Sequence, residues 1–360
     1  PEEFKNLDFS GNVHLSYTSG TTGTPLEIAL TSRALQFQWA VWWRHKSRFG
    51  LEPGDKHIVF GARLPVPSMK SKPPFWRIDK ANNRYYISIY HISQESIGEI
   101  VQMMNEVNFD FYTGYPSALY ALVKHIKEAN LKVKKAPRIV VCGADALTAL
   151  IQREISEFFG TRVTDQYGSA EACGNFSRCE FEKYHLDFEF GIAELLPLTC
   201  STNPNIRKMV FTGFANDAMP LIRYDIGDYG VLSEEKCKCG RESICLDSIE
   251  GRTEELLRTP DGRLVSGLNQ VFEWSAGVDA AQIVQEAEDK LRVLLVPNTN
   301  YSVSDKQKIE NELTRRVGRG IEIKYELVRE LITSKSGKQR LVISNLNSES
   351  LSEQDLKNRQ

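Results

Sequence analysis

The stretch Tyr17-Thr18-Ser19-Gly20-Thr21-Thr22-Gly23-Thr24-Pro25 is the segment from which the rest of the chain is best interpreted. It follows an apolar alternation at Val13, Leu15 and Tyr17, which predicts a strand. Glycines let the backbone turn tightly, so that N–H groups converge on an anion, and the hydroxyls add donors of small volume. The stretch lacks the lysine of the familiar G-x-x-x-x-G-K-[ST] loop, because Leu26 follows Pro25. Two interpretations stay open: a loop that binds a triphosphate, and a Ser/Thr/Gly turn between strands.

The size and composition of the chain are those of an ordinary globular protein. It has 360 residues, of which 41% are hydrophobic and 26% are charged, which suits a large domain plus a small one. The net charge of −2 gives no reason to expect nucleic acid as a partner. No membrane span or signal peptide is visible, so we expect a cytoplasmic protein whose seven cysteines are thiols or metal ligands. Oligomeric state is left open, and a homodimer is compatible with the sequence.

Strands and helices alternate in the first half of the chain, which is the pattern of an α/β fold. Helices are predicted at 32–49, with Ser32 as the cap, at 96–107, from 117 onward and at 148–159, and strands at 57–60, 85–89, 109–112, 138–142 and 162–165. The apolar run at 138–142 is typical of a strand that is buried on both faces of a parallel sheet. Ligands of such sheets bind beyond the carboxyl ends of the strands, where the turns at 143–145 and 166–171 lie.

The sequence pattern changes twice further along. Short strands and turns predominate from about 185 to 250. Residues 258–344 then predict a helix, a strand at 291–296, a helix at 304–317 and a strand at 321–327. We therefore predict a large α/β domain with mixed or parallel sheets and helices at 1–250, a hinge at 251–257, a small C-terminal α+β domain at 258–345 and a polar tail at 346–360. The Pro-rich, basic segment 62–80 is either a solvated loop or a lid over an anionic ligand.

Five segments resemble, in the correct order, the signatures of the adenylate-forming (AMP-binding) superfamily, which includes acyl- and aryl-CoA ligases. They are Tyr17–Pro25 (Y-T-S-G-T-T-G-x-P), Tyr167–Glu171 (Y-G-S-A-E here, usually Y-G-x-[ST]-E), Arg223–Asp228 (R-Y-x-x-G-D), Gly251–Glu255 (G-R-x-D-D) and Ser336–Arg340 (S-G-K-x-R). The fourth departs mildly, since Glu254 and Glu255 replace both aspartates. Because chance matches in this order are implausible, the chain is identified as a member of the phenylacetate-CoA ligase-like branch, with which capsule-biosynthesis proteins are grouped.

The resemblance implies a role for each residue of these segments. A nucleotide site is implied for Thr18, Ser19, Gly20, Thr21, Thr22, Gly23, Gly143, Ala144, Asp145, Asp165, Gln166, Tyr167, Gly168, Ser169, Asp228 and Arg252. In it Tyr167 stacks on adenine, and Asp228 accepts hydrogen bonds from the ribose hydroxyls. Glu171 holds Mg²⁺, a hard cation that prefers oxygen ligands, and Lys338 is the catalytic cation. Glu254 or Glu255 is the hinge pivot, and Tyr112, Gly114 and Tyr115 lie at the acyl pocket. Taken one at a time, Lys338 and each of these acidic residues are more simply solvated side chains.

The activity implied by the resemblance is ATP-dependent activation of a small carboxylic acid. The acid forms an acyl-adenylate, pyrophosphate leaves, and the acyl group passes to a thiol, coenzyme A in the first instance. The aromatic content favours an aryl or other flat acid. A carrier protein, an amine or a hydroxyl is an alternative acceptor. Two alternatives belong to other classes of function. The chain is a module that binds a nucleotide without turnover, or it is a subunit whose partner supplies the family's N-terminal segment, which these 360 residues lack.

Two local pairs of soft donors point to a metal. Cys237 and Cys239 form one pair, and Cys179 and His185 form the other. A Cys₃His set satisfies a closed, tetrahedral, structural zinc site. The C-x-C-G-R segment also resembles the phenylacetate-CoA ligase branch, some members of which carry zinc there. The C-x-C spacing is tighter than that of the commonest zinc pairs, so free thiols and a surface histidine stay the alternative, with Cys245 as a reserve ligand.

Overall fold

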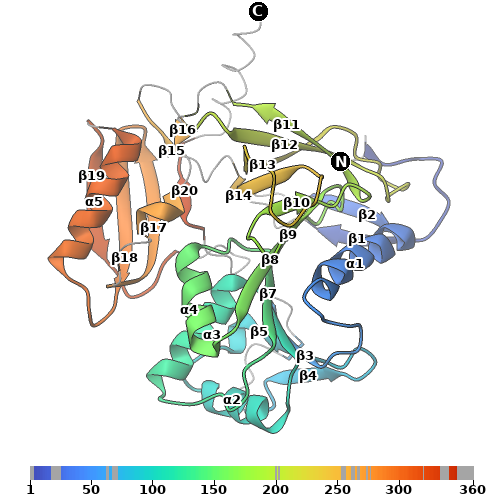
Figure 1. Cartoon of the computed structure of the whole chain (residues 1–360), viewed down its shortest axis with the longest axis horizontal. Helices are drawn as coiled ribbons and strands as arrows, with labels where there is room; N and C mark the ends of the chain where they lie inside the picture. The colour runs from blue at the N-terminus through green and yellow to red at the C-terminus, as the bar shows by residue number, and fades with distance from the viewer. Residues whose placement is uncertain are drawn as a thin grey trace, which may run out of the picture.

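A sheet of twelve strands runs through the large domain (Figure 1). The computed structural model describes residues 4–17, 26–61, 65–66, 72–198, 201, 203–252, 257–260, 264–265, 268–272, 275, 277–318, 320–332 and 340–346. Five neighbouring strands of this sheet are parallel: β5 (Arg84–Ser88), β3 (His57–Gly61), β6 (Phe111–Gly114), β7 (Ile139–Gly143) and β8 (Arg162–Gly168). The edge strand β4 (Trp76–Asp79) is antiparallel to β5.

Helices cover both faces of the parallel strands. They are α1 (Ser32–Ser47), α2 (Ile97–Glu106), α3 (Pro116–Glu128) and α4 (Ala149–Phe159). Tyr112 and Val140 pack into the core beneath α2, α3 and α4, whereas Phe111 and Val141 face the side of Trp43 in α1. Successive residues of a strand point to opposite faces, so the predicted burial of the strand at 138–142 on both faces is confirmed.

The helix ends follow local chemistry. Thr31 caps α1, since its Oγ1 accepts a hydrogen bond from the Ala34 N–H at 3.0 Å; the prediction of Ser32 as the cap is wrong by one residue. Thr148 caps α4, and Gly160 ends that helix in the left-handed conformation at φ +62°. The hairpin of β1 (Val13–Tyr17) and β2 (Glu27–Thr31) leads into α1.

The second half of the sheet is antiparallel. Its strands are β9 (Asn175–Arg178), β10 (Tyr184–Leu186), β14 (Cys245–Arg252), β13 (Tyr224–Leu232), β12 (Ile206–Gly213) and β11 (Gly191–Pro197), in that spatial order after β8. A second apolar core lies between these strands, β2 and α1, with Phe176, Phe190 and Phe211 at its centre. The connection from β8 to β9, which carries Glu171, lies where the parallel half of the sheet meets the antiparallel half.

The small domain is a four-stranded sheet with a helix (Figure 1). Its order is β19 (Glu322–Leu327), β18 (Lys290–Pro297), β17 (Val278–Ala287) and β20 (Val342–Ser344), and α5 (Val303–Val317) packs on it. The short pair β15 (Leu257–Arg258) and β16 (Leu264–Val265) and the 3₁₀ turn at Leu268–Phe272 precede it. The fold class, a large α/β domain plus a small α+β domain, is confirmed. The helix predicted ahead of the strand at 291–296 is wrong, because Val278–Ala287 is a strand.

No helix among the described ranges has the length and apolar character that crossing a membrane requires.

Candidate nucleotide site and metal centre

Three parallel strands end at glycines on the same edge of the sheet: Gly114 ends β6, Gly143 ends β7 and Gly168 ends β8. Gly114 has φ +155°, and a Cβ there would lie 2.2 Å from the carbonyl oxygen of Phe60, so the backbone needs glycine. Ala144 follows β7 at φ +66° and is exposed, with Asp145 after it. This is the edge at which α/β sheets bind ligands.

Tyr167 and Asp228 meet beside this edge. Tyr167 Oη donates a hydrogen bond of 2.5 Å to Asp228 Oδ2, although the residues are 61 positions apart and belong to β8 and β13. Burial, followed by the charge of Asp228, raises the pKa of the tyrosine well above its usual value. Asp228 is 8% exposed, and its backbone is paired with that of Arg252 in β14. Two of the sequence signatures therefore form one polar site.

Glu171 lies in a tight turn after Tyr167. The Ala172 N–H donates to the Ser169 carbonyl at 3.3 Å, and Ala172 has φ +52°. The Glu171 side chain is 5% exposed, and Tyr224 Oη donates to its Oε1 at 3.5 Å. The Ser169 hydroxyl is buried beside the Cys173 thiol, without an oxygen or nitrogen partner among the described residues. A buried carboxylate with a hydroxyl close by offers the oxygen ligands that Mg²⁺ takes, so this turn fits the ion.

The preceding residues of β8 make contacts inside the domain. Tyr184 Oη donates to Asp165 Oδ2 at 2.7 Å, and burial raises the pKa of Asp165. Gln166 Nε2 donates to Ser177 Oγ at 3.2 Å. These side chains support the strand that carries Tyr167. Their assignment to nucleotide binding stays a prediction.

Of the residues assigned to the acyl pocket, Tyr112 is 1% exposed and packs edge to face on Phe60 and Phe159 in the core. Tyr115 is half-buried and precedes α3. The phosphate-loop positions Thr18–Gly23, the hinge residues Glu254 and Glu255, and Lys338 lie outside the described residues, as does the side chain of Arg252. Sequence analysis assigned no role to Tyr224, although it stands inside the R-Y-x-x-G-D signature and contacts Glu171.

The four predicted zinc ligands come together. The donor atoms of Cys179, His185, Cys237 and Cys239 all lie within 4.8 Å of one another. The sulfurs of Cys179 and Cys237 are 3.6 Å apart, and the Cys239 sulfur is 3.2 Å from His185 Nε2. Tetrahedral Zn–S bonds of about 2.3 Å place two sulfurs about 3.8 Å apart, so the cluster fits zinc. Cys245, the reserve ligand, is 3.8 Å from His185 Nε2 and is not needed to complete four donors.

The surroundings of the cluster favour the neutral form of His185. Burial lowers the pKa of His185, and the guanidinium groups of Arg241 and Arg48 lower it further. A neutral imidazole is the form that binds a metal.

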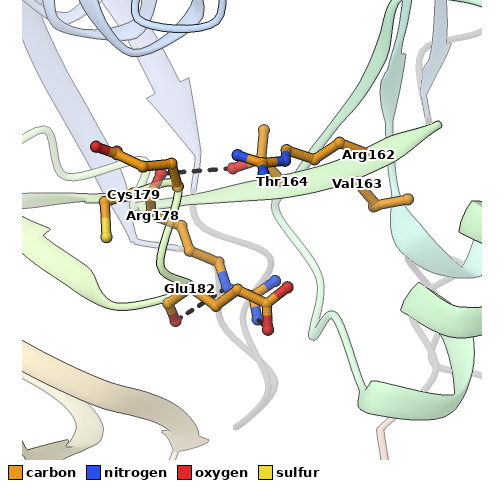
Figure 2. A pocket seen from close by; sticks show the side chains of 7 residues that line it. Arg162, Val163, Thr164, Arg178, Cys179 and Glu182 are labelled. Atoms are coloured by element: carbon orange, nitrogen blue, oxygen red, sulfur yellow. Dashed lines mark hydrogen bonds and ion pairs between the residues drawn. The ribbon is translucent and has the colours of Figure 1, made fainter. Parts of the chain in front are cut away.

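Two cavities adjoin the cluster. A small one of about 40 Å³ lies beside Cys179, where Figure 2 shows the side chains of Arg178 and Glu182. The other, about 630 Å³, lies between the end of α1 and residues 241–244, and its lining includes His185. Neither is lined by Tyr167, Glu171 or Asp228, so the cavities and the candidate nucleotide site are separate.

Comparison with known proteins reveals relatives and structural neighbours. The family model described as CapK C-terminal domain matches residues 257–345. Protein CapK of Staphylococcus aureus is 25% identical over 334 residues, which cover 91% of this chain and 74% of CapK. Phenylacetate-coenzyme A ligase of Thermus thermophilus is 26% identical over 254 residues, 68% of this chain but only 55% of that ligase.

Among solved structures, 2-hydroxyisobutyryl-CoA ligase in the postadenylation state with 2-HIB-AMP has a TM-score of 0.66 to this chain at 16% identity. The match covers 99% of this chain and 77% of the ligase. At that identity the likeness concerns the fold.

Proposed function

Because this chain is a homologue of CapK and of phenylacetate-CoA ligases, and has the fold of acyl-CoA ligases of the adenylate-forming superfamily, we propose that it activates a carboxylic acid with ATP. The product of the first step is an acyl-adenylate, and an acceptor then takes the acyl group. The observation that carries the proposal is the contact of Tyr167 with Asp228, which unites two separate signatures at the ligand-binding edge of the sheet.

The nucleotide is assigned to this edge residue by residue. The ring of Tyr167 stacks on adenine once its hydroxyl has released Asp228, and the Asp228 carboxylate then accepts from the ribose hydroxyls. The turn at Gly143–Asp145 borders the base, and the loop at Thr18–Gly23 receives the phosphates. Glu171 would hold Mg²⁺, which would supply positive charge to offset that of the phosphate oxygens.

The first half-reaction is an in-line displacement at the α-phosphorus. A carboxylate oxygen of the acid forms the new P–O bond, and the bond to pyrophosphate breaks with the electron pair going to the leaving group. Catalysis of such a step consists mainly of positioning and charge stabilisation. We assign Lys338 the role of the cation that stabilises the developing charge, on the strength of its place in the S-G-K-x-R signature.

In the second half-reaction the acceptor displaces AMP from the acyl group. A thiol is the acceptor we favour, with coenzyme A as its source, since ligases that use coenzyme A are among the relatives and the structural neighbours. Transfer to a carrier protein, an amine or a hydroxyl is the alternative. We propose that the small domain changes its orientation at residues 251–257 between the two steps, and that an aryl or other small acid is the substrate.

We further propose a structural zinc ion bound by Cys179, His185, Cys237 and Cys239. The support is the convergence of these four donors, since a Cys₃His set by itself completes a tetrahedral zinc site. The six described cysteines are free thiols, which suits the reducing cytoplasm that we propose as the location.

ATP–pyrophosphate exchange tests the central proposal. Purified protein, Mg²⁺, ATP and labelled pyrophosphate are incubated with a panel of aryl, alkyl and amino acids, one at a time. At least one acid should give exchange above the acid-free blank. If none does, and calorimetry detects no binding of ATP, the chain is not an adenylate-forming enzyme.

A further inference from the structure

The turn that carries Glu171 passes over one face of β11 and β12, at a pair of glycines. Gly191 of β11 and Gly213 of β12 are direct partners in the antiparallel register, so they share one face of the sheet. A Cβ on Gly191 would lie 2.3 Å from the carbonyl oxygen of Cys173. A Cβ on Gly213 would lie 2.9 Å from the Cα of Cys173. The backbone at Cys173 therefore occupies the space that two side chains would fill.

We propose that Gly191 and Gly213 form a slot whose purpose is to position the Glu171 turn, and that both are positioning residues for the adenylation step. The inference rests on the proposed function, since it takes Glu171 as the ligand of Mg²⁺. Here the glycines are required for a close backbone approach, because neither carries a φ in the left-handed region.

The contacts beyond the slot leave the turn little freedom to shift. Ala172 and Cys173 are each 1% exposed. Next to Cys173, a Cβ on Gly174 would lie 2.1 Å from the ring of Phe211, which is buried in the second core and stands two positions before Gly213 in β12. The turn thus packs against both the slot and a buried ring beside it, and packed interiors transmit displacement instead of absorbing it.

A displacement of the Cys173 backbone would move the Glu171 carboxylate. Glu171 stands two positions before Cys173, and the Ala172 N–H closes the turn onto the Ser169 carbonyl at 3.3 Å. Relieving a 2.3 Å contact between carbon and oxygen requires a movement of about 1 Å, because non-bonded atoms of this kind stay roughly 3.3 Å apart or more. A misplacement of about 1 Å in a catalytic group is enough to lower a rate by about 100-fold.

The test compares Gly191→Ala and Gly213→Ala with a matched control, Gly98→Ala. Gly98 is a glycine of α2 around which a Cβ would meet nothing within 4 Å. We expect Gly191→Ala to lower pyrophosphate exchange about 100-fold and Gly213→Ala, whose contact is milder, about tenfold. The Mg²⁺ concentration for half-maximal exchange should rise in both, while affinity for AMP measured without Mg²⁺ stays within about threefold of wild type. Gly98→Ala should match wild type.

Hydrogen–deuterium exchange of the amides at 169–174 gives a readout independent of activity. Both slot variants should exchange faster there than wild type, with unchanged exchange in β7 and α4. Wild-type Mg²⁺ dependence together with wild-type amide exchange in a folded Gly191→Ala protein would overturn the slot. If Gly191→Ala does not fold, the same criteria apply to Gly213→Ala. If wild type itself shows no pyrophosphate exchange, the proposed function fails, and amide exchange alone decides whether the glycines hold the turn.

Discussion

Tyr120 of α3 donates a hydrogen bond from its hydroxyl to the backbone carbonyl of Asp279, the second residue of β17 in the small domain. Lys124, one helical turn further along α3, lies 3.8 Å from the Asp279 carboxylate. The two domains thus touch through a helix that starts directly after Tyr115, at the carboxyl end of β6. In this arrangement the small domain lies beside the edge of the sheet to which we assign the nucleotide.

Removing this contact should separate the two half-reactions. In a Tyr120→Phe, Lys124→Ala protein we expect acid activation to fall by up to about tenfold, since one hydrogen bond contributes about 0.5–1.5 kcal/mol. Thioester formation from a supplied acyl-adenylate should be unchanged or faster, because the domain is freer to leave this position. Lys127→Ala is the control on the same helix, since its partner Glu154 belongs to the large domain. Equal loss in both half-reactions would contradict the idea that this contact between the domains serves acid activation alone.

Asp228→Ala should act mainly on ATP binding. The ribose contact that we assign to Asp228 would be made before and during the reaction, so its loss should raise KM more than it lowers kcat. Hydrogen bonds to a charged group contribute about 1.5–3 kcal/mol, which corresponds to a rise in KM for ATP of about 10- to 100-fold. Tyr167→Phe keeps the ring that we expect to stack on adenine and loses only the hydroxyl that donates a hydrogen bond to Asp228. It should therefore change KM for ATP by less than about threefold. A Tyr167→Phe defect as large as that of Asp228→Ala would argue against stacking as the role of the ring.

Lys338→Ala should impair the first half-reaction alone. A charged donor directed at the transition state contributes roughly 3–4 kcal/mol, equal to about two to three decades in rate. Pyrophosphate exchange measures that step, and transfer from a supplied acyl-adenylate measures the other. Lys335→Ala, in the same segment, serves as the comparison. The assignment fails if transfer from the supplied acyl-adenylate drops as far as the exchange does.

Protein purified without added metal should contain about one zinc per chain by elemental analysis. Cys237→Ser should lose the metal and unfold at a lower temperature, because the ion joins Cys179 to Cys237 across 58 positions. By the chain-entropy argument for cross-links, closing a loop of that length is equivalent to about 4 kcal/mol. Cys245→Ser should retain zinc, since the other four donors complete the site. Metal-free protein of undiminished stability would remove the zinc site.

Stability should fall as the pH drops from about 6.5 toward 4. His45 is 0% exposed, and burial, with the charges of Arg48 and Lys46, lowers its pKa to about 3. Burial likewise lowers the pKa of His57 to about 4. Both folded-state values lie below the unfolded value of about 6.5, so the unfolded chain binds more protons, and each histidine contributes a slope of up to about 1.4 kcal/mol per pH unit within this window.

Urea unfolding at pH 7.5 and pH 5 measures this slope. His45→Leu should reduce the loss of stability between the two values, whereas His14→Gln, a change at an exposed histidine, should leave it as in wild type. Identical losses in wild type and His45→Leu would show that the buried ring does not control acid stability.

The α/β alternation was predictable from local pattern because each element of the large domain has a clear period and clear ends. The predicted helix ahead of Leu291 shows where that reasoning fails. The strand β17 is rich in Ala, Gln and Glu, residues with good helix propensity. Its conformation is decided by partners elsewhere: Gln282 donates to the carbonyls of Ile332 and Arg340, and Gln285 donates to that of Arg258. The hydrogen bonds of these two fully buried glutamines to distant backbone carbonyls outweigh a weak local preference for helix.

By itself, the sequence determined which residue types the two candidate sites contain: the signature residues around Tyr167, Glu171 and Asp228, and the two pairs of proposed zinc donors. It did so because residue type and short spacing are local properties. The tertiary structure decided which of these groups meet. Cys179, His185 and Cys237 converge because β10 lies between β9 and β14, a pairing of segments far apart in the chain. The close approach of Cys173 to Gly191 and Gly213 depends on register between β11 and β12 and leaves no local signal, since a glycine that makes room for a distant backbone looks in sequence like any other glycine.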